Sequence, residues 1–286
     1  MAIGDTRRDG SAGASGDTIE LRHFFLTSGA APDSQSSALD AAPVLPAQPC
    51  VLAGPPGCGK TTLLFTYAVN AAARGLRVTF LTLREAVETS PPLLSPASAP
   101  AGALHAVDMK YLRGEDDLVR WCASSHLLAT PPHCVLVDGL TALLDRDVRE
   151  GARTHGGNMA REVRLARCLA LLVDATQHAT ARLARAAEAG SSTVKTCQLL
   201  IGDRSGDGGE APPMWFVWRR WTPLALICRT ARAHADSTGG QQEPGFHGSG
   251  TAYQLALLPS ETGPACPGSV RYSRTANTIV ADAVMP

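Results

Sequence analysis

One short motif constrains the fold of this chain more than any other feature. Residues 54–61 read GPPGCGKT and match the pattern G-x-x-x-x-G-K-[ST] in full. An apolar stretch at 50–53 precedes the motif, and a helical pattern follows it from about Lys60 to Arg74. In a strand–loop–helix unit of this kind, backbone N–H groups and the helix N-terminus surround phosphate groups. The motif therefore predicts an α/β fold with a nucleotide-binding loop.

The residues of this loop have distinct expected roles in binding ATP and Mg²⁺. Lys60 is expected to reach the β- and γ-phosphates as a point charge, and the Thr61 hydroxyl to ligate Mg²⁺. Pro55 and Pro56 stiffen the front of the loop but leave the amides of residues 57–61 intact. The residues predicted to bind the nucleotide are Gly54, Gly57, Cys58, Gly59, Lys60, Thr61 and Thr62. The alternative is a chance match or a loop that no longer binds nucleotide, which the intact context disfavours.

A second acidic element is predicted to complete the metal site. Asp138 ends the apolar run 134–138 at the carboxyl end of a predicted strand, where open α/β sheets place ligands. An aspartate of the Walker B type holds a water on Mg²⁺ from this position. The alternative is an ordinary strand-end aspartate that caps a turn. Gly139 follows, so the Asp-Glu pair that supplies the base in many ATPases is absent.

The order of the remaining segments favours a RecA-like core. A β-rich stretch at 78–83 lies between the two motifs in sequence, as expected when an extra strand separates the motif strands in the sheet. In kinase-like folds the two motif strands are neighbours. Strands alternate with helical segments, which predicts a mostly parallel sheet with helices on both faces. Short strands near 251–258, 269–274 and 277–284 predict an antiparallel C-terminal edge. The other predicted elements are helices at 115–128 and 159–188, strands near 195–201 and 224–228, and a loop at 145–158.

Glu85 is the candidate catalytic base. In RecA-like ATPases a glutamate near the end of this intervening strand polarises the attacking water, and here the region reads FLTLREAVE. The position where that glutamate is expected is Arg84, and a shift of one residue turns a side chain to the other face of a strand. Glu85 is therefore either the base, placed beside a water in line with the γ-phosphate, or a solvent-exposed carboxylate. In the second case hydrolysis is weak.

Composition limits the remaining choices. Residues 1–47 mix Gly, Ser, Ala, Asp and Pro around an apolar island at Phe24, Phe25 and Leu26, which predicts a tail that is disordered or loosely docked before an ATPase domain at 48–286. Lys+Arg and Asp+Glu both number 26, so any contact with nucleic acid must be a local patch. No apolar run of about 18 residues predicts a membrane span. The 8 cysteines lack zinc-binding spacing and are expected to be reduced thiols, as in the nucleus or cytoplasm.

Several segments together resemble one protein family. They read GPPGCGKTTLLF, FLTLREAVETSPPLL, WCASSHLLATPPHCVLVDGLTALL and LLVDATQHATARL, in this order. They are similar to the SWIM-protein-associated ATPase of animal Shu-type recombination complexes, a RecA-family recombinase paralogue. The resemblance runs from about residue 48 to the C-terminus and weakens after residue 200. The DGL turn and the LLVDATQH helix make it more specific than the nucleotide motifs alone.

The resemblance implies a nuclear role in homologous-recombination DNA repair. It implies an ATPase that binds single-stranded DNA and, with a SWIM-domain zinc protein, helps the strand-exchange recombinase and its paralogues assemble on that DNA. An alternative from another class is a non-catalytic scaffold that binds nucleotide and stabilises its partner, which the shifted glutamate supports. A small-molecule kinase is disfavoured, because no recognisable arginine-rich lid or acceptor motif follows the loop.

One candidate DNA-contacting segment follows the second motif. In RecA-like folds the DNA-facing loops follow the Walker B strand and the next core strand, which are near 145–158 and 202–213 here. The first contains Arg146, Arg149 and Arg153 among glycines, a composition that can order around phosphates. Neighbouring acidic residues offset much of this charge, so an ordinary solvated loop is the alternative.

A second candidate is the aromatic and basic segment MWFVWRRW at 214–221. Its rings interleave with Arg219 and Arg220, as in proteins that stack bases and attract the backbone of single strands. Tryptophans at this density more often serve a core or a protein interface, so that interpretation is favoured.

Overall fold

The strands of the central sheet bring the two motifs to one edge. The computed structural model describes residues 18–25, 39–93, 102–149, 157–190, 194–206, 211–231, 251–258, 268–275 and 279–285. Within these residues the main sheet has the order β11-β10-β9-β8-β3-β7-β6-β4-β5. Its strands are β3 (Cys50–Gly54), β4 (Val78–Leu83), β5 (Val107–Leu112), β6 (Cys134–Asp138), β7 (Gln198–Arg204), β8 (Leu224–Thr230), β9 (Thr251–Leu257), β10 (Ser269–Arg274) and β11 (Ile279–Met285).

The direction of these strands confirms the predicted fold class. β8, β3, β7, β6, β4 and β5 pair in parallel, whereas β9, β10 and β11 continue the sheet in antiparallel pairs. β7 lies between β3 and β6, so the two motif strands are separated in the sheet, as expected for a RecA-like core. The separating strand is therefore β7, and the predicted strand at 78–83 lies on the far side of β6.

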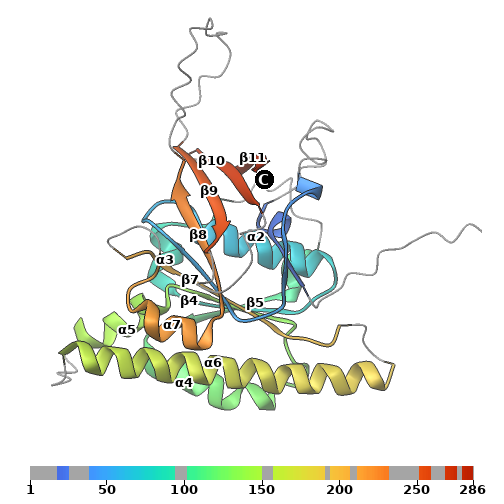
Figure 1. Cartoon of the computed structure of the whole chain (residues 1–286). Coiled ribbons are helices and arrows are strands. Elements are labelled where there is room, and N and C mark those ends of the chain that lie inside the picture. The colour runs from blue at the N-terminus through green and yellow to red at the C-terminus, as the bar shows by residue number, and fades with distance from the viewer. Residues whose placement is uncertain are drawn as a thin grey trace, which may run out of the picture.

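Helices cover both faces of this sheet, as Figure 1 shows. The helical elements are α2 (Lys60–Ala73), α3 (Arg84–Thr89), α4 (Glu115–Ser124), α5 (Leu140–Arg149), α6 (Gly157–Glu188) and α7 (Trp215–Trp221), with short 3-10 turns η1 (Leu21–Phe24), η3 (Ala103–Ala106) and η4 (Ser125–Leu127). Along β3, Cys50 and Leu52 pack in the core beside α2, and Val51 and Ala53 pack in the core beside α5 and α6. Because both faces are buried, the parallel strands are continuous apolar runs.

The two described ends of the predicted loop at 145–158 are helical. α5 continues to Arg149 and α6 begins at Gly157, and residues 150–156 lie outside the described residues. The reason is the spacing of Leu140, Leu143 and Leu144, which places three fully buried leucines on one helix face. No helix among the described residues is long and apolar enough to cross a bilayer.

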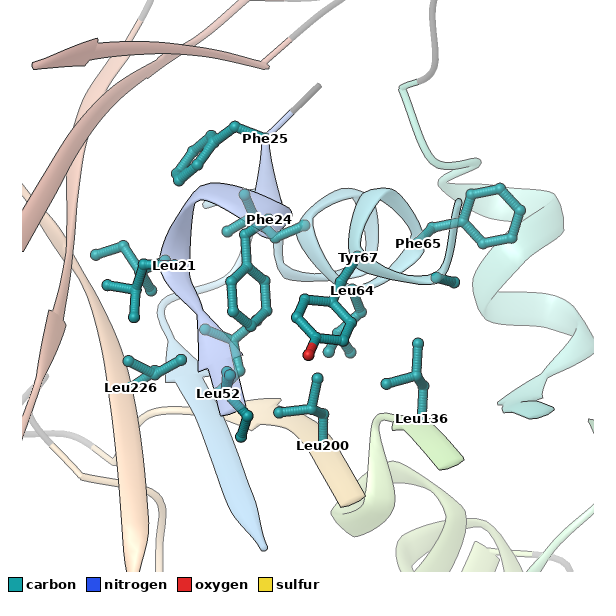
Figure 2. Close-up of a cluster of buried hydrophobic side chains, with 14 of the residues drawn as sticks. Leu21, Phe24, Phe25, Leu52, Leu64, Phe65, Tyr67, Leu136, Leu200 and Leu226 are labelled. Carbon is teal, nitrogen blue, oxygen red and sulfur yellow. The ribbon is translucent and has the colours of Figure 1, made fainter. Parts of the chain in front are cut away.

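The described parts of the predicted N-terminal tail, residues 18–25 and 39–47, pack on the core. β1 (Thr18–Glu20) pairs antiparallel with β2 (Val44–Pro46), and η1 packs against α2. In Figure 2, Leu21 and Phe24 lie among Leu52, Leu200 and Leu226 of three core strands. Phe24 is only 1% exposed. The apolar island thus buries enough surface to hold the segment on the core.

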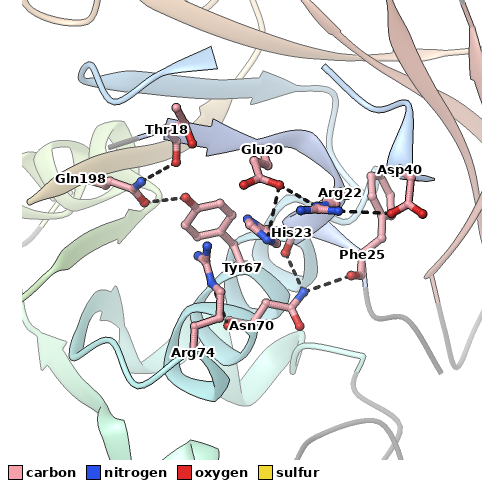
Figure 3. A network of polar contacts seen from close by, with 10 residues as sticks. All are labelled: Thr18, Glu20, Arg22, His23, Phe25, Asp40, Tyr67, Asn70, Arg74 and Gln198. Atoms are coloured by element: carbon pink, nitrogen blue, oxygen red, sulfur yellow. Dashed lines mark hydrogen bonds and ion pairs between the residues drawn. The ribbon is translucent and has the colours of Figure 1, made fainter. Parts of the chain in front are cut away.

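Polar side chains of the core satisfy the backbone of this segment (Figure 3). Gln198 Nε2 donates to the Thr18 carbonyl at 2.7 Å, and Gln198 Oε1 accepts from the Tyr67 hydroxyl at 2.5 Å. Asn70 Nδ2 donates to the carbonyls of His23 and Phe25 at 2.9 and 3.0 Å. Burial lowers the pKa of His23 to about 4, so this imidazole is neutral at physiological pH.

Candidate nucleotide-binding site

The phosphate-binding loop has the backbone that its sequence predicts. Gly59 precedes α2 with a φ of 93°, a left-handed conformation that residues with a side chain rarely adopt. Because of this turn, α2 begins at Lys60 and its free N–H groups point at the loop. The Cys58 side chain is buried beneath the loop, where a hydrogen bond with the Cys228 thiol and the charge of Lys60 lower its pKa to about 6.

Lys60 bends into this loop. Its Nζ donates to the carbonyl oxygens of Gly54 and Pro55 at 2.8 and 2.9 Å and lies 3.7 Å from Cys58 Sγ. The ammonium is thus held by neutral main-chain acceptors at the front of the loop. A phosphate is a stronger acceptor for an ammonium than a neutral carbonyl, so it can replace these partners.

Thr61 and Asp138 meet as the sequence predicts for a shared Mg²⁺ site. The Thr61 hydroxyl donates to Asp138 Oδ2 at 2.8 Å and so joins the start of α2 to the end of β6. A hydroxyl and a carboxylate side by side are suitable oxygen ligands for Mg²⁺, which takes few protein ligands and completes its shell with phosphate and water. No group of three or more His, Cys, Asp or Glu side chains in the described ranges could hold a metal by itself. The donor set therefore fits Mg²⁺ bound together with a nucleotide.

Asp138 is a buried carboxylate. Asp138 is the last residue of β6, at the carboxyl end of the strand, and it is 7% exposed. Burial raises the pKa of Asp138 from its ordinary value of 3.8 to about 6, while the Thr61 hydrogen bond and the Lys60 charge oppose this shift. A bound cation removes the electrostatic cost of the buried charge, so metal binding favours the ionised form.

Asp203 is a functional-site residue that sequence reasoning missed. It lies at the end of β7, beside Asp138, and accepts hydrogen bonds from the Thr141 amide at 2.8 Å and the Thr141 hydroxyl at 2.5 Å. The Gly139 amide donates to the Gly202 carbonyl at 2.8 Å. Burial raises the pKa of Asp203. The end of β7 thus fixes the turn that follows Asp138. The only sequence signal for Asp203 was an acidic residue shortly after an apolar run.

A cavity of about 480 Å³ gathers most of the charged groups of the site. The charged residues that line it are Lys60, Glu85, Asp138, Asp145, Arg146, Asp203 and Arg204. Glu85 lies in the first turn of α3, its side chain is 69% exposed, and Oε1 is 3.1 Å from Arg146 Nη2. The structure therefore brings Glu85 to the nucleotide side of the sheet, but as one half of an ion pair.

The remaining predicted site residues lie in several places. Arg146 lines the nucleotide cavity, Arg149 is the last residue of α5, and Arg153 lies outside the described residues. Thr62 is buried, and its hydroxyl accepts from the Leu93 amide at 3.0 Å.

The aromatic and basic segment forms α7, which packs on α6. Trp218 is fully buried, in agreement with the core interpretation. Phe216, Arg219 and Arg220 share one face of the helix at spacings of three and four residues, and all three are exposed. This exposed face keeps one ring of the DNA-contact hypothesis, that of Phe216, together with both guanidinium groups, while Trp218 lies in the core.

Comparisons with known proteins agree with the resemblance expected from the motifs. No protein-family model matches the chain. The human protein named ATPase SWSAP1 is 29% identical over 160 residues, which cover 56% of this chain and 63% of the human protein. The mouse protein of the same name is 32% identical over 100 residues, 35% of this chain and 36% of the mouse protein. The chain thus spans less than two thirds of the length of the curated relatives that it matches. On fold, site and sequence together, it is a RecA-like α/β protein similar to mammalian proteins named ATPase SWSAP1.

Proposed function

We propose that this protein binds Mg²⁺·ATP in the loop at 54–61 and hydrolyses it slowly. The observation that carries the proposal is the hydrogen bond between Thr61 and Asp138, because it brings the two motifs together at the mouth of the loop that holds Lys60. The name ATPase of the two relatives supports the same activity.

The residues would act in a simple order. Lys60 exchanges the Gly54 and Pro55 carbonyls for phosphate oxygens, and the amides of the loop bind the remaining phosphate oxygens. Thr61 and Asp138 hold Mg²⁺, which when bound neutralises charge on the phosphates. Asp203 keeps the turn after Asp138 in place through Thr141. Glu85 can orient a water only after it leaves Arg146, which accounts for slow turnover.

Titration of ATP into wild-type protein and Lys60→Ala tests the binding step. Loss of the only lysine in the loop should weaken ATP binding strongly, because a charged hydrogen bond to phosphate is replaced by nothing. Lys110→Ala is the matched control, since Lys110 lies on the edge strand β5, which β7, β6 and β4 separate from β3, and pairs with Asp108 at 3.0 Å. Equal ATP affinity in Lys60→Ala and wild type would contradict the proposal.

The wider role we propose is that of an accessory factor in homologous-recombination DNA repair in the nucleus. In this role the protein binds single-stranded DNA and, with a SWIM-domain zinc protein, promotes assembly of the strand-exchange recombinase and its paralogues. Support comes from the similarity to the SWSAP1 proteins and from the exposed basic face of α7. Recovery of bound proteins from cells tests it: finding neither a SWIM-domain protein nor a recombinase would refute it.

A non-catalytic scaffold that binds nucleotide and stabilises its partner is a second candidate. The ion pair between Glu85 and Arg146 and the 69% exposure of the Glu85 side chain favour it, because a base must face the attacking water. Steady-state phosphate release by the partner-bound protein, with and without single-stranded DNA, separates the two. Turnover that Lys60→Ala abolishes supports the ATPase, and the absence of turnover with intact ATP binding supports the scaffold.

A further inference from the structure

The C-terminal strands reach back to the phosphate-binding loop. The Tyr272 hydroxyl of β10 donates to the Cys58 carbonyl at 2.9 Å, a contact between residues 214 positions apart. Tyr272 is fully buried and stacks on Tyr253 of β9 with ring centroids 5.5 Å apart. A side chain at Gly59 would collide with Ile279 at the start of β11. The loop therefore packs against β10 and β11 as closely as glycine allows.

Arg274 extends from β10 toward the same loop. It lies two residues after Tyr272, so both side chains leave the same face of the strand. Arg274 Nη1 is 3.9 Å from the point that a Cβ atom at Gly57 would occupy, and Arg274 Cδ is 3.4 Å from the corresponding point at Gly59. The guanidinium thus lies beside the amides that are expected to bind phosphate.

This guanidinium has unused hydrogen-bonding capacity. Arg274 Nε is buried and has no hydrogen-bond partner within the part of the chain that the structure describes. The described residues also provide no ion-pair partner for Arg274, although the neighbouring Ser273 bonds to Asp282 at 2.6 Å. A buried N–H group without an acceptor is unfavourable, and an anion that supplied the acceptor would relieve that cost.

We infer that Arg274 is a second cation of the nucleotide site and binds the phosphate chain of a nucleoside di- or triphosphate within the same chain. The inference rests on the proposed ATP binding. A guanidinium offers paired N–H donors that match two phosphate oxygens, which an ammonium such as that of Lys60 does not. In that case β10 of the same subunit covers the phosphate-binding loop beside Cys58 and Gly59.

The position of Arg274 also selects among the phosphates. Lys60 lines the cavity that contains Asp138 and Glu85, whereas Arg274 is not among the residues that line it. Arg274 instead lies beside Gly57 and Gly59, and its guanidinium is not grouped with the residues expected at the γ-phosphate. It should contact the phosphates nearer the nucleoside, so ATP and ADP should depend on it to the same degree.

Titrations of ATP and ADP into the whole 286-residue chain test this inference. Arg274→Gln should weaken ATP and ADP by about 10- to 100-fold each, the effect of losing a charged hydrogen bond. Arg274→Lys should recover part of the affinity, because it keeps the charge without the paired donors. Arg271→Gln is the matched control: Arg271 lies on the same strand, but its side chain leaves the opposite face.

The outcomes separate this inference from the proposed function. If Lys60→Ala loses ATP binding while Arg274→Gln binds ATP and ADP like wild type, the inference is wrong and the proposed function stands. If Arg271→Gln weakens binding as much as Arg274→Gln, the effect comes from strand packing, and the inference is again wrong. If wild-type protein binds neither ATP nor ADP, both fail. The inference is supported if Arg274→Gln weakens ATP and ADP binding to the same degree while Arg271→Gln binds both like wild type.

Discussion

Replacing Asp138 with Asn should make the nucleotide-free protein more stable at alkaline pH. The folded protein raises the pKa of Asp138 from 3.8 to about 6, mainly by burial, so the folded state keeps the carboxyl proton after the unfolded chain has lost it. Stability therefore falls as pH rises through this window, and the loss is complete above the folded pKa. The full loss is about 3 kcal/mol, from the difference in pKa at roughly 1.4 kcal/mol per unit.

Asparagine does not titrate and still offers an oxygen to the Thr61 hydroxyl. The free energy of unfolding of Asp138→Asn minus that of wild type should therefore increase by about 2 kcal/mol between about pH 4.5 and about pH 8. Urea denaturation of the metal-free protein at both pH values measures it. Asp108→Asn is the control, because Asp108 is an exposed carboxylate on β5. A difference that does not change with pH would refute the argument that Asp138 is a buried, destabilising charge.

The same substitution should lower phosphate release more than ATP affinity, because metal position matters most in the transition state.

Three further predictions concern the N-terminal segment, the base and DNA. Phe24→Ala should lower the free energy of unfolding in urea by about 3–5 kcal/mol, since Phe24 is 1% exposed. Phe216→Ala is the control and should cost far less, because Phe216 is 57% exposed. Equal costs would mean that the N-terminal segment is not docked. Glu85→Gln should lower phosphate release without changing ATP affinity, and unchanged release would assign the base elsewhere. Neutralising Arg146, Arg149 and Arg153 together should weaken single-stranded DNA binding and reduce its salt slope by roughly 0.7 per lost phosphate contact. Arg146→Gln alone is the control for that triple variant, because Arg146 also pairs with Glu85, and an unchanged slope in the triple variant would exclude the segment as a DNA contact.

Local sequence patterns predicted the parts of the site that are close together in sequence. Gly59, Lys60 and Thr61 belong to one loop, whose conformation follows from the glycine and from the helix that begins there. Asp138 was predictable because an acidic residue after a buried parallel strand lies at the ligand edge of the sheet. The strand–helix alternation likewise predicted the parallel sheet and its antiparallel edge.

The residues that were not predicted depend on tertiary contacts. Asp203 follows an apolar run with Gly202 between, so the signal was weaker than for Asp138 and its role is clear only once β7 lies beside β6, whereas Arg274 is recognisable only once β10 lies over the loop. β5 was missed because VDMKYL is an edge strand in which Asp108 and Lys110 interrupt the apolar residues, unlike the continuous apolar runs of the buried strands. The place where the described parts of the N-terminal segment pack could not be predicted, because the composition is polar overall while its few apolar residues fill a specific place in the core. The composition of a segment therefore does not show whether the rest of the chain offers a place to bury it.

The N-terminal segment also imposes a sequence of events on biosynthesis. Thr18 bonds to Gln198, which is 180 positions later in the chain. The ribosome releases the N-terminus first, so Leu21 and Phe24 emerge long before β7, which carries Leu200 of their cluster (Figure 2). Until then α2 is the main element they can contact, and their apolar surface is open to association with other nascent chains. Complete docking of Leu21 and Phe24 must therefore wait until β7 has been translated.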